Sequence, residues 1–241
     1  MKPHLSIVIP AYNESSRLVP TLERIREYLS AQDYAAEVIV VSDGSTDATA
    51  AVARDWCPPG FPLAVIDRKQ NRGKGYSVRE GGAAAAGELV LFSDADLSTP
   101  IEEFEKFRSR LAGGAAVVIG SRNLSGADLE IRQPFYRRVM GRVFNLVVKT
   151  FAVGGIADTQ CGFKCFAAEA FAAIASRCLI DGFSFDVEML FLARRLGFKI
   201  EEVPVRWLNA EGSTVSPVRD SIRMFFDVVR VRWNHLCGRY R

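Results

Sequence analysis

The sequence lacks the patterns that mark membrane-spanning, secreted or zinc-binding proteins. No run approaches the roughly 18 apolar residues of a membrane-spanning helix. A strand-like pattern begins at Leu5, which leaves no room for a signal peptide. The five cysteines are odd in number and irregularly spaced, so we expect neither a disulfide framework nor a zinc site. A reducing, cytoplasmic location is the expectation that follows.

Glycine and histidine are missing where several enzyme classes need them. The turn after the first strand-like segment, Pro10–Glu14, has no glycine, and the basic stretch Arg68–Gly75 has neither Walker A nor G-x-G-x-x-G spacing. These absences disfavour a dinucleotide-binding oxidoreductase and a sugar nucleotidyltransferase. Neither His4 nor His235 lies in a polar motif. Nucleic-acid binding is disfavoured because the basic residues are not interleaved with aromatic ones.

Strand-like and helix-like segments alternate through the first half of the chain. The expected strands are Leu5–Pro10, Glu37–Ser42, Leu63–Asp67, Glu88–Ser93 and Ala115–Ser121, and the expected helices are Glu14–Ser30, Thr46–Arg54, Tyr76–Gly87 and Pro100–Leu111. Short strands separated by helices predict an α/β domain with a mostly parallel sheet. Polar clusters follow all five strands, so they should meet along the carboxyl edge of the sheet, where ligands bind in such folds.

Asp94-Ala95-Asp96 is the most informative of these clusters. Two carboxylates separated by one residue, directly after an apolar strand, can bind a hard divalent cation that is also held by phosphate and water. The alternative is a solvated turn that caps the next helix. We assign that cap to Ser98 or Thr99, because Pro100 suits the first helical position.

Two further clusters point to an anionic ligand. Asp43 ends a strand and can accept a hydrogen bond from a base or ribose, while Ser45 or Thr46 caps the next helix. The Arg68–Gly75 stretch is basic and precedes a helix, and backbone N–H groups there favour anions. A tight turn and a solvated loop are the respective alternatives.

Two basic amphipathic helices are expected in the second half, Arg132–Ala152 and Pro217–Leu236. Residues 217–241 carry six arginines against two aspartates, in a chain of net charge +3. In the second helix one side should be polar and the other apolar, the apolar set being Ile222, Phe225, Phe226, Val229 and Trp233. These apolar sides either enter a membrane interface or pack on the sheet or another subunit. We divide the chain into a domain of residues 1–216 and a basic amphipathic helix of residues 217–241.

In combination, the motifs resemble family-2 glycosyltransferases, which have the nucleotide-sugar-binding GT-A fold. The matching stretches are SIVIPAYNE (6–14), DGSTD (43–47), NRGKG (71–75), DADLS (94–98) and GSR (120–122). DTQCGFK (158–164) and FDVE (185–188) look like the polyprenyl- or dolichyl-phosphate sugar synthase branch, closest to the dolichyl-phosphate β-glucosyltransferases.

The resemblance implies roles for individual residues. The nucleotide sugar would be held by Pro10, Ala11, Tyr12, Glu14, Asp43, Lys74, Asp94 and Ala95. A Mg²⁺ or Mn²⁺ ion would be held by Asp94 and Asp96. Catalytic roles would fall to Asp96, Arg122, Gln160 and Glu188, and the acceptor phosphate would meet Arg132, Arg137 and Arg138. Relatives often have a paired Asp-Asp where this chain has Ser42-Asp43, so only Asp43 can act there.

The expected reaction is inverting transfer of a hexose, glucose from UDP-glucose, to a polyprenyl or dolichyl phosphate. A lipid phosphate is already an anion at neutral pH, so the protein's task is positioning and charge neutralisation. Other nucleotide sugars such as GDP-mannose, and a non-catalytic membrane-peripheral nucleotide-binding module, are the alternatives. We expect peripheral attachment to the cytoplasmic face of a membrane, and the sequence leaves the oligomeric state open, a homo-oligomer included.

Overall fold

The computed structural model describes residues 2–129, 153–208 and 217–241. The predicted helix Arg132–Ala152, with Arg132, Arg137 and Arg138, lies outside the described residues. The side chains of residues 217–223 lie outside them as well. No helix in the described ranges is long and apolar enough to cross a bilayer.

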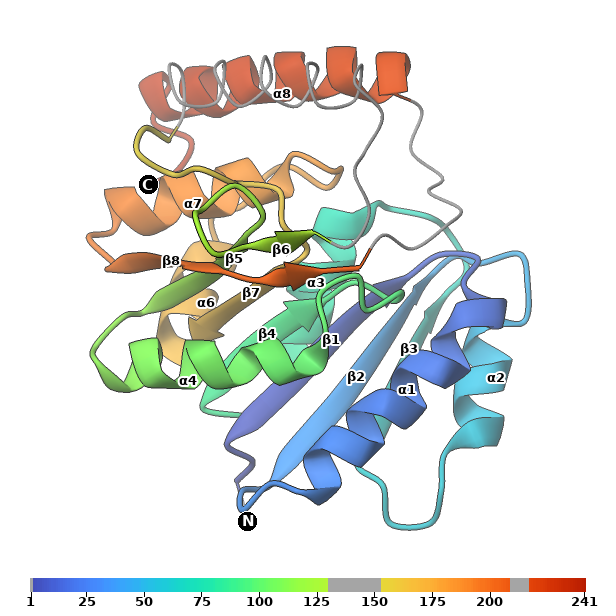
Figure 1. Cartoon of the computed structure of the whole chain (residues 1–241). Coiled ribbons are helices and arrows are strands. Elements are labelled where there is room, and N and C mark those ends of the chain that lie inside the picture. The colour runs from blue at the N-terminus through green and yellow to red at the C-terminus, as the bar shows by residue number, and fades with distance from the viewer. Residues whose placement is uncertain (1, 130–152, 209–216) are drawn as a thin grey trace.

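A mixed sheet forms the centre of the described structure, with strand order β3-β2-β1-β4-β7-β5-β8 (Figure 1). Its strands are β1 (Leu5–Ala11), β2 (Ala36–Asp43), β3 (Leu63–Arg68), β4 (Leu89–Ser93), β5 (Val117–Ser121), β7 (Phe163–Ala167) and β8 (Ile200–Pro204). All run parallel except β7, which is antiparallel to both β4 and β5. A separate short pair joins β6 (Asp128–Leu129) to β9 (Arg206–Trp207).

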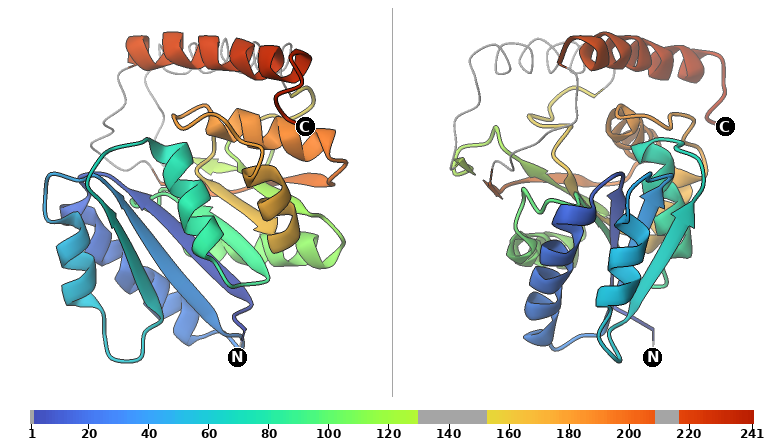
Figure 2. Two further views of the ribbon diagram at one scale, coloured as in Figure 1. Left: turned by 180° about the vertical axis from the view of Figure 1, so that it is seen from behind. Right: turned by 90° about the vertical axis from the view of Figure 1, so that its right-hand side faces the viewer.

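Helices cover both faces of the sheet because the central strands are apolar on both sides. One face carries α1 (Ser15–Ser30), α2 (Thr49–Trp56), η1 (Ile101–Glu103) and α4 (Phe104–Ala112), and the other carries α3 (Lys74–Ala84), α6 (Ala168–Ala175) and α7 (Phe185–Arg195) (Figures 1 and 2). Each face has its own core. Leu18, Leu22 and Phe107 are fully buried on the first, and Val78, Ile174 and Leu190 on the second. The predicted α/β class with a mostly parallel sheet is confirmed.

Strand β7 was not among the strands expected from the sequence. It lies between β4 and β5 in the sheet. Lys164 of β7 is in register with Phe92 on one side and Ile119 on the other. An alternating strand–helix pattern cannot reveal a later strand that enters in the opposite direction. As a result the 158–162 stretch, which precedes β7, reaches the same edge at which β4 and β5 end.

The helix caps predicted at Ser45 or Thr46 and at Ser98 or Thr99 are wrong. Helix α2 begins at Thr49, and its first turn is held by Asp47, whose Oδ1 accepts from the Thr49 amide at 3.0 Å. Neither Ser98 nor Thr99 caps the helix near Pro100, because η1 has no side-chain cap. Ser45 and Thr46 instead bond to the turn at Asn13.

Helix α8 (Pro217–Leu236) occupies the predicted position and lies against α7 (Figure 1). Among the residues of α8 whose side chains are described, Val228, Val231 and Asn234 are buried. Phe225, Phe226, Val229, Trp233 and Leu236 are exposed, and we call these five residues the apolar stripe. The division of the chain at residue 217 stays a prediction.

Candidate active site

The polar clusters predicted from the sequence meet at the carboxyl edge of the sheet. Because β1 to β5 are mutually parallel, the segments that follow them leave at one edge. The 158–162 stretch adds to this edge because β7 runs the other way. We call the assembled region the rim.

Asp94 is held between a cation and a glycine. Its Oδ1 accepts from Lys74 Nζ at 2.5 Å, and its amide donates to the Gly162 carbonyl at 3.2 Å. A Cβ at Gly162 would lie 1.9 Å from Asp94 Oδ2, so only glycine leaves room for this carboxylate. Although burial lowers the pKa of Lys74, the carboxylates of Asp94 and Asp186 raise it more, which keeps the ammonium charged.

Asp96 lies in the same turn, and its carboxylate can bind a ligand. Its Oδ1 accepts from the Ser98 amide at 2.9 Å, and Leu97 between them has a positive φ of 45°. The Ala95 carbonyl accepts from Thr21 Oγ1 at 2.6 Å, which ties the turn to α1. The turn is therefore fixed from both of its flanks.

The first loop, after β1, brings Glu14 close to these aspartates. Burial raises the pKa of Glu14, Arg17 opposes this, and the charges of Asp96 and Asp94 raise it further. Tyr12 is exposed while Ala11 is buried, and Pro10 is half-buried. The loop therefore offers an exposed aromatic ring beside an acidic pair.

Asp43 organises the basic loop. Its carboxylate accepts from the amides of Arg72 and Gly73 at 2.7 and 2.8 Å and from the Arg68 guanidinium. Its expected partner was a base or ribose, so the observed contacts add a structural function that the sequence did not indicate. They turn the loop so that Lys74, the first residue of α3, points to Asp94.

Arg122 is paired with a carboxylate that we did not single out from the sequence. Its Nε and Nη2 donate to Asp158 at 2.7 and 3.0 Å, and Asp158 also accepts from the amide of Gln160 at 3.2 Å. Burial alone would raise the pKa of Asp158, but Arg122 lowers it to about 2. Gln160 is half-buried, and its Nε2 lies 3.9 Å from Met224 Sδ of α8.

A buried ion pair between Lys164 and Asp186 holds the 158–162 stretch in place. Lys164 is fully buried, and its Nζ donates to Asp186 Oδ1 and to the Cys161 carbonyl, both at 2.5 Å. Burial raises the pKa of Asp186 and Lys164 opposes this. Lys164 stands in the DTQCGFK motif, but only the fold shows that its partner comes from α7.

Glu188 lies apart from these contacts. Its carboxylate is fully buried and accepts from the amides of Leu179 and Ile180 at 2.8–3.0 Å and from the Tyr240 hydroxyl at 2.7 Å. These contacts hold the end of the chain against α7. A catalytic role for Glu188 stays a prediction, as do the roles assigned to the other site residues.

The described residues suit a cation that shares its ligands with a substrate. Within the described ranges there is no group of three or more His, Cys, Asp or Glu side chains able to hold a metal. Asp94 and Asp96 offer hard carboxylate oxygens, which fits an ion that takes one or two carboxylates and completes its shell with phosphate. The donor set therefore fits Mg²⁺ or Mn²⁺ bound together with a diphosphate.

Comparison with known proteins agrees with this geometry. The family model "Glycosyl transferase family 2" matches residues 6–172. The dolichyl-phosphate β-glucosyltransferase of Dictyostelium discoideum is 35% identical over an alignment 247 residues long. The alignment covers 98% of this chain and 76% of that protein. The human dolichyl-phosphate β-glucosyltransferase is 34% identical over 250 residues, covering 98% and 77%.

Solved structures share the fold. Glucosyl-3-phosphoglycerate synthase from Mycobacterium tuberculosis, in complex with Mn²⁺, UDP-glucose and phosphoglyceric acid, matches with a TM-score of 0.71 at 22% identity. The match covers 98% of this chain and 80% of that one. Mannosyl-3-phosphoglycerate synthase from Rubrobacter xylanophilus matches with a TM-score of 0.71 at 20% identity, covering 99% and 76%. With these matches the expected GT-A fold is confirmed.

The family model spans more than half of the chain, and the relatives align over nearly all of it. This chain belongs to glycosyl transferase family 2, in the branch of the dolichyl-phosphate β-glucosyltransferases.

Proposed function

We propose that this protein transfers glucose from UDP-glucose to a polyprenyl or dolichyl phosphate with inversion at the anomeric carbon. The observation that carries the proposal is the Asp94-Ala95-Asp96 turn, fixed at the rim between Lys74 and Gly162. The relatives named for this reaction support the choice of glucose and of a lipid phosphate.

The chain's own residues position charge in this reaction. Lys74 donates to Asp94 and Arg122 donates to Asp158, so both cations are held at the rim, and we assign them to the charge of the leaving diphosphate. The acceptor phosphate attacks as an anion, so no group has to remove a proton from it. Gln160, next to the paired Asp158, is the polar side chain we assign to the sugar or acceptor side.

Asp94 and Asp96 would hold a divalent ion, Mg²⁺ or Mn²⁺. When bound, such an ion neutralises charge on the diphosphate. The presence of Mn²⁺ or Mg²⁺ together with UDP in structures of glucosyl-3-phosphoglycerate synthase supports this assignment.

We also propose that the protein works as a peripheral protein on the cytoplasmic face of a membrane. The apolar stripe on α8 supports this, because Phe226, Trp233 and Leu236 are 65%, 62% and 70% exposed. Arginines 230 and 232 are exposed on the same helix and favour anionic headgroups.

The test is transfer of labelled sugar into lipid. The protein is incubated with polyprenyl-phosphate vesicles, Mn²⁺ and either labelled UDP-glucose or labelled GDP-mannose, and the lipid fraction is counted. We expect label from UDP-glucose, its loss in Asp96→Asn, and full activity in Asp67→Asn, a matched change at an exposed carboxylate. Label only from GDP-mannose would replace the donor, and binding of nucleotide without transfer of any label would favour the non-catalytic module.

A further inference from the structure

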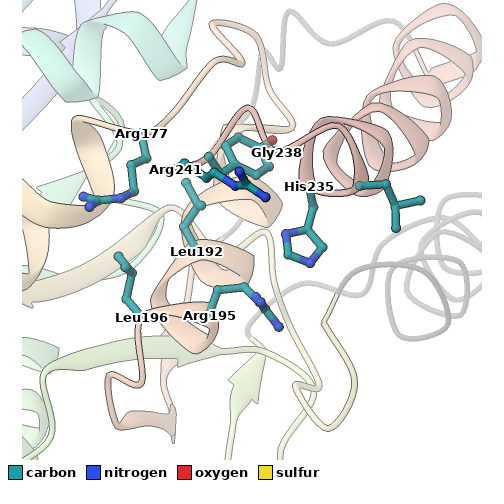
Figure 3. Close-up of a pocket in the computed structure, with 9 residues that line it drawn as sticks. Arg177, Leu192, Arg195, Leu196, His235, Gly238 and Arg241 are labelled. Carbon is teal, nitrogen blue, oxygen red and sulfur yellow. The ribbon is translucent and has the colours of Figure 1, made fainter.

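A cationic cavity lies at the end of α7 that is remote from the rim (Figure 3). It has a volume of about 290 Å³, and Arg177, Arg195, Arg241 and His235 are among its lining residues. Asp186 lies in the first turn of α7 and Arg195 is its last residue, so the two ends are about 14 Å apart along the helix axis. The cavity is therefore separate from the donor site.

The positive charges of Arg177 and Arg195 are not neutralised by the side chains that line this cavity. No aspartate or glutamate side chain is among the residues that line it. Over the described ranges, Arg177, Arg195 and Arg241 form no ion pair with a carboxylate, and Arg177 Nη1 donates to the Ala173 carbonyl at 2.7 Å. The nearest acidic group that the structure connects to the lining is Glu188, which is already bonded to the Tyr240 hydroxyl. Burial lowers the pKa of His235, and the charges of Arg195 and Arg232 lower it further.

The cavity adjoins the apolar stripe. Leu236 belongs to both, and Trp233 lies one helical turn before it. A helix that lies in a membrane interface places its apolar side chains at the boundary between acyl chains and headgroups. A cavity at the end of such a helix then opens at the level of the headgroups. Charge and position together select an anion that is attached to a lipid.

We propose that this cavity binds the phosphate-bearing headgroup of an anionic phospholipid and so fixes the orientation of α8 on the membrane. The proposal rests on the peripheral membrane association proposed above, and it is independent of the sugar that is transferred. Arg177, two residues after α6, and Arg195, the last residue of α7, contact the headgroup, while Trp233 and Leu236 enter the lipid beside it.

The first experiment measures partition of the whole protein onto vesicles without any nucleotide sugar. One set of vesicles is phosphatidylcholine, and the other also contains phosphatidylglycerol. A basic side chain near an anionic surface contributes about fivefold to partition, so Arg177→Gln/Arg195→Gln should lower partition onto the anionic vesicles about 25-fold. Partition onto neutral vesicles should stay unchanged. Trp233→Ser should weaken partition onto both.

The matched control is Arg108→Gln/Arg110→Gln, which removes two charges from α4 on the opposite face of the sheet. It should change partition less than about twofold, because this face is directed away from the bilayer. An equal loss in both double variants would reduce the effect to net charge and overturn the proposal. So would a loss of the same size on neutral vesicles.

The second experiment uses the two histidines of the chain as reporters. Short-chain phosphatidylglycerol below its micelle concentration should shift the imidazole NMR signals of His235 and leave those of His4 in place, since His4 lies near Glu88 at 3.0 Å and far from the cavity. Inorganic phosphate at the same concentration should shift His235 less. If it shifts His235 equally, the cavity takes free anions and the lipid assignment is overturned. Because no donor is present, failure of glucosyl transfer would not alter either result.

Discussion

The ion pair between Arg122 and Asp158 offers a direct test of how the rim is held together. In Asp158→Asn the carboxylate loses its charge while its shape is kept. The pKa of Asp158 falls from an ordinary 3.8 to about 2 in the folded chain. At 1.36 kcal/mol per unit, this difference stabilises the folded state by about 2 kcal/mol at neutral pH. The exposed pair of Arg54 and Asp67, separated by 3.4 Å, should contribute less than about 0.5 kcal/mol.

Urea unfolding at neutral pH, followed by tryptophan fluorescence, measures both values. Asp158→Asn should lower the free energy of unfolding by about 2–3 kcal/mol, because Arg122 is left without its charged partner. Asp67→Asn serves as the control and should stay close to the parent protein. A loss at Asp158 no larger than the loss at Asp67 would refute the inference that the buried pair stabilises the rim.

The pH dependence of the same difference gives an independent check. The folded pKa of Asp158 is depressed, so its stabilisation is complete above the unfolded pKa near 4 and is lost as the pH falls through about 2. The gap between the parent and Asp158→Asn should therefore be constant from neutral pH to about pH 5 and should shrink to roughly half by about pH 3. A gap that widens on acidification would contradict the assigned direction.

Three further predictions concern the rim and the end of the chain. Gly162→Ala should abolish most sugar transfer with little loss of stability, because the new Cβ would displace the Asp94 carboxylate. A Gly182→Ala control, where nothing lies within 4 Å of the new Cβ, should transfer sugar normally, and unchanged transfer in Gly162→Ala would remove the role of that contact. Tyr240→Phe should lower the free energy of unfolding by about 1–2 kcal/mol, because buried Glu188 loses a donor; urea unfolding measures it, and an unchanged midpoint would contradict it. Chelation with EDTA should stop transfer of labelled glucose and added Mn²⁺ should restore it, whereas full transfer in EDTA would exclude the proposed metal site.

The amino-acid sequence by itself determined the parallel strands, the carboxyl edge at which the polar clusters meet, and the family. Each of these depends on local signals: apolar runs of strand length, helical periodicity between them, and motifs at the ends of strands. The Asp94-Ala95-Asp96 turn and the basic Arg68–Gly75 loop could be placed on one edge because parallel strands all end on the same side.

Only the tertiary structure decided which side chains became partners and which face of α8 was buried. Strand β7 enters between β4 and β5 from the opposite direction, so Lys164 meets Asp186 of α7 and Arg122 meets Asp158. The periodicity of α8 marked an apolar side, but the fold buries Val228 and Val231 against α7 and leaves the apolar stripe exposed. The physical reason is that periodicity describes one helix alone, whereas burial and ion pairing depend on the distance to other elements, which a single sequence does not contain.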